Sequence, residues 1–228
     1  NGSQFGLQLS YKVQPSPDGL AQAFVLGEEF IGNDSVAMVL GDNIFYGSGF
    51  SQYLRNAVEK AENGGASIFG YFVTDPERFG IVEFDSNGKV ISVEEKPEKP
   101  KSNYCITGLY FYDNSVVHKA KHLKPSKRGE YEITDLNRLY LEEGHLHVQL
   151  LGRGYAWLDT GTMDSLVDAA DFVRTLEKRQ GLKISAIEEI AYNKGWITKD
   201  ELIEAAKRYG KSPYGQHLMN VAEGKIQY

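Results

Sequence analysis

Three carboxylates stand where chemistry is expected. Asp42 ends the apolar run VAMVL and begins the polar, glycine-rich stretch GDNIFYGSG, and Asp159 follows large apolar residues in GYAWLDTGT. Glu95 lies in VEEKP, where the chain should leave a strand. Mg²⁺ in enzymes is commonly bound by one or two carboxylates together with substrate phosphates. Asp42 and Asp159 would suit such an ion if their strand ends meet; the alternative is that each caps a helix or closes a turn.

Lys96 and Arg128 are the candidate cations for an anionic substrate. A lysine before proline favours an extended exit from a strand, and the neighbouring Glu95 and Lys96 suit a sugar hydroxyl and a phosphate. The alternative for each cation is a surface ion pair. Four of the five histidines form two pairs, His118 with His122 and His145 with His147, and neither pair has a third ligand beside it, which disfavours a zinc site. The sequence has neither a glycine-rich phosphate-binding motif nor a serine nucleophile elbow.

The composition is that of an ordinary soluble globular protein. The chain has 228 residues and a formal net charge of −6, which gives no support to a nucleic-acid surface. Cys105 is the only cysteine, so no internal disulfide can form, and its place in YCITGLYFY predicts a small core residue. No apolar run reaches transmembrane length. We therefore expect no membrane partner and a cytoplasmic location.

Alternating and continuous apolar patterns predict a chain of strands and helices. Strands are expected at 7–14, 36–41, 66–73, 80–84, 89–97, 104–113, 145–152 and 154–159. Helices are expected from Asp18, as a cap, to Ile31, then at 50–63, 113–122, 132–143 and 164–180, with three short helices after 184. The run at 36–41 is typical of an interior strand of a parallel sheet, and the last two strands resemble a pair. These patterns predict an α/β body over 1–183 with a helical extension over 184–228.

Six blocks carry a resemblance to the glucose-1-phosphate thymidylyltransferases, in the order found in that family. They are YKVQPSPDGLAQAF, LGDNIFYG, DPERFGIVEFD, VEEKPEKPKSNYCITGLYFYD, RGEYEITDLN and GYAWLDTGT. The resemblance implies a Rossmann-like mixed sheet of the nucleotide-diphospho-sugar transferase type. It also implies the conversion of glucose 1-phosphate and dTTP into dTDP-glucose and pyrophosphate with Mg²⁺, in deoxysugar (dTDP-L-rhamnose) biosynthesis. Members of the family are commonly homotetramers.

The resemblance also assigns roles to individual residues. Asp42 and Asp159 would hold Mg²⁺, and Gln14 and Gly19 would contact the thymine base. Lys96 and Arg128 would position the attacking phosphate. The residues implied for sugar phosphate binding are Gly80, Glu95, Lys96, Ile106, Tyr110 and Arg128. Phe79 replaces a tyrosine that is common in the family, and we expect a modest effect because the ring is kept.

One family feature is not found in the sequence. Family members begin with a strand and a GGxGTRLxPxT loop that binds the nucleotide phosphates, followed by a lysine in KQLLP. From the size of a first βαβ unit, the resemblance begins about seventy residues into the family pattern. We therefore expect this chain to be inactive alone. The alternatives are a non-catalytic sugar-nucleotide-binding or regulatory chain, and a related pyrophosphorylase that uses UTP.

Overall fold

The computed structural model describes residues 1–226, and it divides the chain into two compact units. One unit comprises Lys12–Ser165, and the other comprises Asn1–Tyr11 together with Leu166–Tyr228. Each unit is described by itself. The predicted boundary at residue 183 stays a prediction.

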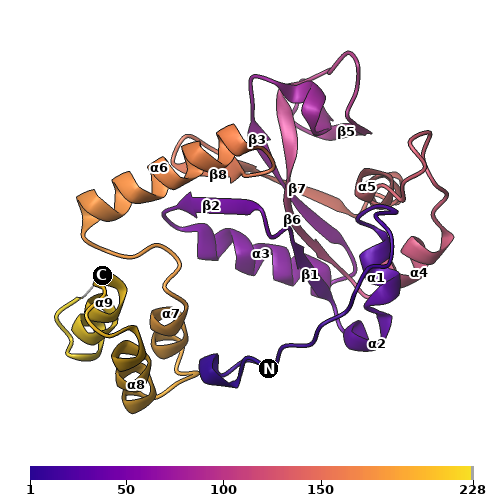
Figure 1. Ribbon diagram of the computed structural model, residues 1–228. Coiled ribbons are helices and arrows are strands. Elements are labelled where there is room, and N and C mark those ends of the chain that lie inside the picture. The colour runs from indigo at the N-terminus through magenta and orange to yellow at the C-terminus, as the bar shows by residue number, and fades with distance from the viewer. Residues whose placement is uncertain (227–228) are drawn as a thin grey trace. The chain divides into compact units, whose positions relative to one another are not determined.

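The Lys12–Ser165 unit is built on a mixed β-sheet (Figure 1). Its strand order is β5-β4-β6-β3-β7, and β1 also pairs with β6. The β3–β7 pair is parallel and the other pairs are antiparallel. A separate two-stranded ribbon joins β2 and β8. The bounds are β1 Val36–Val39, β2 Asn43–Gly47, β3 Ala66–Phe72, β4 Gly80–Phe84, β5 Val90–Glu95, β6 Tyr104–Tyr112, β7 Leu146–Leu151 and β8 Tyr155–Asp159.

Helices cover both faces of this sheet (Figure 1). One core lies on the face of β6 that carries Ile106, Tyr110 and Tyr112, and it includes side chains of α1, α4 and α5. The other face carries Leu109 and Phe111, which pack with α3. The bounds are α1 Gln22–Leu26, α2 Glu28–Ile31, α3 Phe50–Glu62, η2 Pro76–Arg78, α4 Ser115–His122, α5 Ile133–Glu142 and α6 Met163–Gln180, whose first residues end the unit.

Two predictions near the N-terminus are wrong. Residues 7–14 form no strand, because no strand of the described chain pairs with this segment. Alternation of apolar and polar side chains gives a segment two faces, but a strand also needs a hydrogen-bonded neighbour. Side chains there, such as Tyr11 and Val13, are exposed. The helix expected from Asp18 begins at Gln22 as α1 and continues as α2. The Asp18 carboxylate accepts hydrogen bonds from the side chains of Ser16 and Gln22 instead of capping the helix.

Two predictions about strand pairing are also wrong. The strand at 36–41 is not interior to a parallel sheet: β1 pairs antiparallel with β6 only, and Val39 is exposed. The strands at 145–152 and 154–159 do not pair with each other. β7 runs parallel to β3, and β8 pairs with β2. An apolar run indicates burial, but it does not identify the neighbouring strand.

The second unit is helical. It contains η1 Ser3–Phe5, α7 Ile187–Asn193, α8 Lys199–Tyr209 and α9 Pro213–Ala222, and its core is formed by apolar side chains such as Leu202 and Leu218. Thr198 and Glu201 form a capping box at the start of α8. The buried Glu189 carboxylate lies 2.6 Å from Nε2 of His217, which joins α7 to α9. None of the helices described in residues 1–226 is long and apolar enough to cross a membrane.

Candidate functional site

The β2–β8 ribbon brings Asp42 and Asp159 to the same end. Asn43, the first residue of β2, lies opposite Asp159, the last residue of β8. Beyond this pair, the backbone N–H and the hydroxyl of Thr160 both donate to the Asp42 carbonyl oxygen, each at 2.9 Å. The two carboxylates therefore come from neighbouring backbone positions, although Asp42 and Asp159 are 117 positions apart in the chain.

Each of these carboxylates keeps one oxygen free within the described chain. Asp42 Oδ1 accepts from Asn43 Nδ2 at 2.8 Å, and Asp159 Oδ1 accepts from the backbone N–H of Gly161 at 3.0 Å. Residues 1–226 contain no group of three or more histidine, cysteine or acidic side chains that could hold a metal. A pair of carboxylates fits Mg²⁺, which keeps water and substrate phosphates as its other ligands. The structure thus suits the predicted metal role of Asp42 and Asp159, which stays a prediction.

Asn43 joins this ribbon to the main sheet. Its Oδ1 accepts from the buried backbone N–H of Gly108 on β6 at 2.8 Å and from Trp157 Nε1 on β8 at 2.6 Å. A Cβ atom at Gly108 would lie 2.5 Å from this oxygen, so only glycine permits the contact. Asn43 was not among the site residues predicted from the sequence. Its position directly after Asp42 was a signal, because the amide group of an asparagine can donate to a neighbouring carboxylate while its oxygen accepts hydrogen bonds from other elements.

A second cluster surrounds Glu95 at the end of β5. Glu95 pairs with Gly80 across the β4–β5 hairpin, and its Oε2 accepts from the Thr134 hydroxyl at 2.5 Å. A Cβ atom at Gly80 would lie 2.8 Å from Thr134 Oγ1, 3.2 Å from Glu95 Oε2 and 3.5 Å from Ile106 Cδ1. The missing side chain at position 80 therefore leaves room for these three residues. Thr134 was also missed, because its place at the start of a predicted helix reads as a local cap.

The electrostatic surroundings of Glu95 favour its protonated form. Burial is the main cause, and it raises the pKa of Glu95 above its usual value. The hydrogen bond from Thr134 opposes this shift, the carboxylate of Glu132 adds to it, and Lys96 and Arg128 oppose it. A carboxyl group with a raised pKa is well placed to exchange hydrogen bonds with hydroxyl groups of a ligand.

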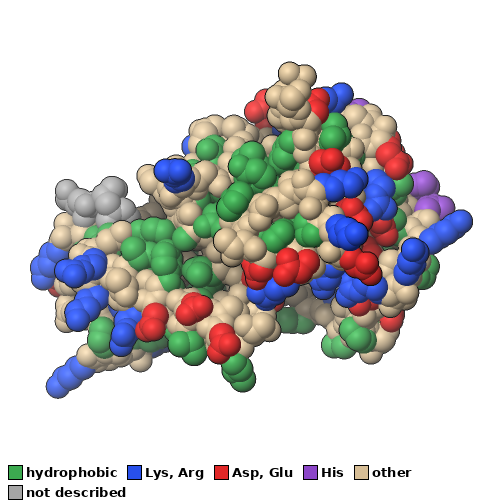
Figure 2. Space-filling view, turned by 90° about the horizontal axis from the view of Figure 1, so that it is seen from above, with side chains coloured by type: hydrophobic (Ala, Val, Ile, Leu, Met, Phe, Trp, Pro, Cys, Tyr) green, Lys and Arg blue, Asp and Glu red, His purple; other side chains and the backbone are tan. Residues whose placement is uncertain are grey.

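Arg128 lies among carboxylates. Its guanidinium is 2.9 Å from Glu130, 3.3 Å from Glu132 and 3.6 Å from Glu95. Figure 2 shows Lys and Arg side chains intermixed with Asp and Glu side chains on the face it displays. The structure therefore brings Arg128 close to Glu95, and the positive charge of Arg128 is shared among three acidic side chains.

Lys96 does not have the extended backbone that its position before Pro97 predicts. Its φ is +41°, in the left-handed region that few residues other than glycine adopt, and its N–H donates to the Phe79 carbonyl at 3.0 Å. The exposed Lys96 is followed by the buried Pro97. Such conformations store strain, and they occur often at functional sites.

The Phe79 ring packs edge-on against Trp157 at 5.4 Å, so the ring expected here serves packing.

The remaining predicted residues lie in two places. Gln14 Nε2 donates to the Gly19 carbonyl at 3.2 Å, so these two residues are in direct contact. Gly19 has a φ of +112°, and a Cβ there would lie 2.5 Å from the Tyr131 carbonyl oxygen. Ile106 and Tyr110 are buried on the same face of β6. Burial raises the pKa of the Tyr110 hydroxyl, and the charges of Glu95 and Asp42 add to the effect.

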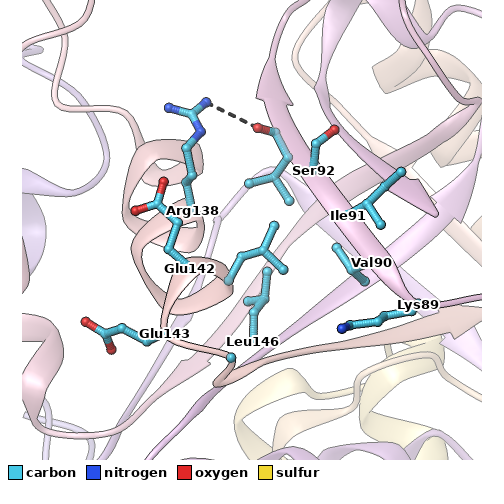
Figure 3. A pocket seen from close by; sticks show the side chains of 11 residues that line it. Lys89, Val90, Ile91, Ser92, Arg138, Glu142, Glu143 and Leu146 are labelled. Carbon is cyan, nitrogen blue, oxygen red and sulfur yellow. Dashed lines mark hydrogen bonds between the residues drawn. The ribbon is translucent and has the colours of Figure 1, made fainter. Parts of the chain in front are cut away.

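A hollow of about 700 Å³ lies beside β5 and the second half of α5 (Figure 3). It is lined by apolar residues such as Val90, Val93 and Leu146, with Lys89, Arg138 and Glu142 among them. None of the predicted site residues lines it. Val93, which lines it, lies two residues before Glu95 in β5.

The sequence places this chain among the nucleotidyl transferases. The sequence model of the nucleotidyl transferase family matches residues 1–175. The glucose-1-phosphate thymidylyltransferase of Neisseria gonorrhoeae is 59% identical over 221 residues, which cover 97% of this chain and 76% of that protein. The enzyme of the same name from Mycobacterium tuberculosis is 55% identical over 223 residues, covering 98% of this chain and 76% of that protein.

Solved structures agree. A crystal structure from Bacillus anthracis, assigned to the same class of enzyme, has a TM-score of 0.68 at 42% identity and covers 76% of this chain and 68% of that one. A UDP-glucose pyrophosphorylase complexed with UDP-glucose has a TM-score of 0.61 at 21% identity, covers 73% and 66%, and shares the fold. The chain therefore belongs to the nucleotidyl transferase family, and within it to the glucose-1-phosphate thymidylyltransferases. The resemblance and the fold class inferred from the sequence are confirmed.

Proposed function

We propose that the protein transfers a thymidylyl group from dTTP to glucose 1-phosphate, giving dTDP-glucose and pyrophosphate. An oxygen of the sugar phosphate attacks the α-phosphorus of dTTP and forms the new P–O bond. The bond between the α-phosphorus and the oxygen bridging to the β-phosphorus breaks, and pyrophosphate leaves with that electron pair. The reaction is a single in-line displacement, so no side chain of the protein acts as a nucleophile.

One observation supports this proposal above the others: β6 links the two clusters. Gly108 N–H binds Asn43, which adjoins Asp42. Ile106, two residues earlier on β6, lies next to Gly80 and the Glu95 carboxylate. Two residues of a strand span about 6.5 Å, which is the scale of a sugar phosphate. A substrate that holds its sugar at Glu95 would direct its phosphate toward the carboxylate pair.

The proposed roles follow from these positions. Glu95 and the backbone at Gly80 hold the sugar hydroxyls, and the buried Ile106 and Tyr110 form the floor on which the sugar lies. Lys96 and Arg128 orient the attacking phosphate, with Arg128 exchanging part of its contact with the acidic side chains for the phosphate. Asp42 and Asp159 would hold Mg²⁺, which when bound offsets phosphate charge.

Base selection is proposed for Gln14 and Gly19, whose contact presents a carboxamide and a backbone segment to the thymine. The use of the product in deoxysugar biosynthesis, a homotetrameric assembly and a cytoplasmic location are proposals that rest on the family resemblance alone.

The test separates binding from turnover in the 228-residue chain. Glucose 1-phosphate and dTDP-glucose binding are measured by calorimetry, and pyrophosphate release is measured with Mg²⁺ and each of dTTP, UTP, GTP, ATP and CTP. Turnover confined to dTTP would support the proposal, and turnover with UTP in preference would overturn the choice of base. Binding without turnover by any nucleotide would agree with the expectation that this chain is inactive alone, and also with the non-catalytic alternative.

Variants assign the roles within the same test. Asp42→Asn and Asp159→Asn should weaken Mg²⁺-dependent binding of dTDP-glucose, and Glu95→Gln should weaken glucose 1-phosphate binding. Asp34→Asn is the matched control, since Asp34 is an exposed acidic residue of the same unit. Equal effects of Asp34→Asn and Asp42→Asn would remove Asp42 from the proposed metal site.

A further inference from the structure

Helix α5 contacts strand β5 through two polar bonds. The Thr134 hydroxyl on the first turn of α5 donates to the Glu95 carboxylate. One turn later, Arg138 Nη2 donates to the Val93 carbonyl oxygen at 3.2 Å, the bond drawn as a dashed line in Figure 3. The helix therefore holds the end of the strand at two points, of which Glu95 is one.

The distance between the two bonds along α5 matches the distance between them along β5. Four residues of an α-helix rise about 6 Å, and two residues of a strand span about 6.5 Å. Thr134 and Arg138 are four residues apart, and Val93 and Glu95 are two apart. Because the spacings agree, both bonds form only in one register. A slide of β5 by one residue would turn the Glu95 side chain to the opposite face of the sheet.

Little else holds β5 on its outer side. It is the last strand in the sheet order, so within the described chain no further strand pairs with it there. The hollow of about 700 Å³ lies along Lys89–Val93, and Val93 is the residue of this segment that is buried in the core. Arg138 lies in the wall of that hollow. Its guanidinium is in turn held by Asp135, whose Oδ1 accepts from Nη1 at 2.5 Å.

We propose that Arg138 is a positioning residue for sugar phosphate binding that acts through Glu95. By binding the Val93 carbonyl it keeps the end of β5 in the register in which Thr134 reaches the Glu95 carboxylate. Arg138 itself does not touch the substrate. This inference rests on the proposed function, in which Glu95 holds the sugar.

The test compares Arg138→Met, which keeps the length of the side chain without its donors, with Arg138→Lys, which keeps one charged donor. Glucose 1-phosphate binding to the full chain is measured by calorimetry, and dTMP binding, which reports the Gln14 region, is measured on the same samples. Arg138→Met should weaken glucose 1-phosphate binding about tenfold, the loss of one charge-assisted hydrogen bond. Arg138→Lys should recover most of this loss, and dTMP binding should stay unchanged in both.

A second comparison separates positioning from general stability. Thr134→Ala should weaken glucose 1-phosphate binding, and adding Arg138→Met to it should cause little further loss, because both residues act through the same carboxylate. Arg55→Met is the control, since Arg55 is an exposed arginine of the same unit whose side chain binds Gln52. Independent, multiplying losses from Thr134→Ala and Arg138→Met would overturn the inference.

The outcomes separate a failure of this inference from a failure of the proposed function. If the parent chain does not bind glucose 1-phosphate, the proposed function fails. If the parent binds it and Arg138→Met binds it equally well, the proposed function stands and the role of Arg138 is overturned. A parallel loss of glucose 1-phosphate and dTMP binding in Arg138→Met would likewise overturn it, because the effect would then be unfolding.

Discussion

Replacing Asn43 by alanine should destabilise the Lys12–Ser165 unit more than is usual for the replacement of a half-buried asparagine. The change leaves two donors without their acceptor, the Gly108 N–H and the Trp157 indole N–H, and both residues are buried. A buried donor without a partner costs about 1–3 kcal/mol. Water can reach the end of the β2–β8 ribbon, so the lower part of the range applies, about 2–3 kcal/mol for the two donors together. For a protein of this size, that lowers Tm by about 4–12 °C.

The assay follows the unit that contains the change. The chain has two tryptophans, Trp157 and Trp196, and Trp196 belongs to the other unit. In a Trp196→Phe background, thermal unfolding followed by fluorescence reports Trp157 alone. Asn43→Asp keeps an acceptor oxygen, so it should lose less than half as much as Asn43→Ala. Asn56→Ala, at an exposed position on α3, should leave Tm within about 2 °C.

Two results would refute this reasoning. A Tm for Asn43→Ala within the range of Asn56→Ala would mean that the two hydrogen bonds do not hold the ribbon to the sheet. An equal loss in Asn43→Ala and Asn43→Asp would mean that the acceptor oxygen is not the cause.

Three further predictions concern the second cluster and the core. Gly80→Ala should push the Thr134 hydroxyl away from Glu95 and lower the free energy of unfolding by about 1–3 kcal/mol. It should also abolish glucose 1-phosphate binding, measured by calorimetry. An unchanged melting curve together with unchanged binding would contradict the geometry. The folded state raises the pKa of Glu95 above the ordinary 4.5, so its contribution to stability is present below pH 4.5 and is lost as pH rises through the folded value. The unfolding free energy of Glu95→Gln relative to the parent, from urea titrations, should therefore increase from pH 4.5 toward neutrality, and a flat difference would exclude the effect. Burial raises the pKa of the Cys105 thiol to about 12, so a disulfide reagent should modify it at pH 8 only after denaturation, and rapid modification of the folded chain would disprove its burial.

Sequence reasoning succeeded where the determining forces are local. Helix α3 follows from its apolar periodicity, and the β4–β5 hairpin follows from alternation around a DSNG turn. The strand ends at Asp42 and Asp159 were singled out because apolar runs stop there. Each of these features depends on neighbours within a few residues.

It failed where the partner lies far away in the chain. The alternation of residues 7–14 could not show that no strand of the described chain pairs with them. Asn43 reads locally as part of a turn, and its acceptor role depends on Gly108, 65 positions later. Thr134 reads as a helix cap, yet its hydroxyl binds Glu95, 39 positions earlier. Contacts of this kind leave no periodic trace in the sequence.

The β2–β8 ribbon has a consequence for the order in which the chain folds. The contact between Asp42 and Thr160 closes a loop of 118 positions, whereas the cluster around Glu95 lies wholly within Gly80–Thr134. Closing a longer loop costs more entropy, and a ribosome completes the earlier residues first. A nascent chain that has not yet reached Tyr155 therefore has every side chain of the Glu95 cluster, but only one of the two carboxylates of the ribbon. During synthesis the proposed sugar site can therefore be complete before the proposed metal site.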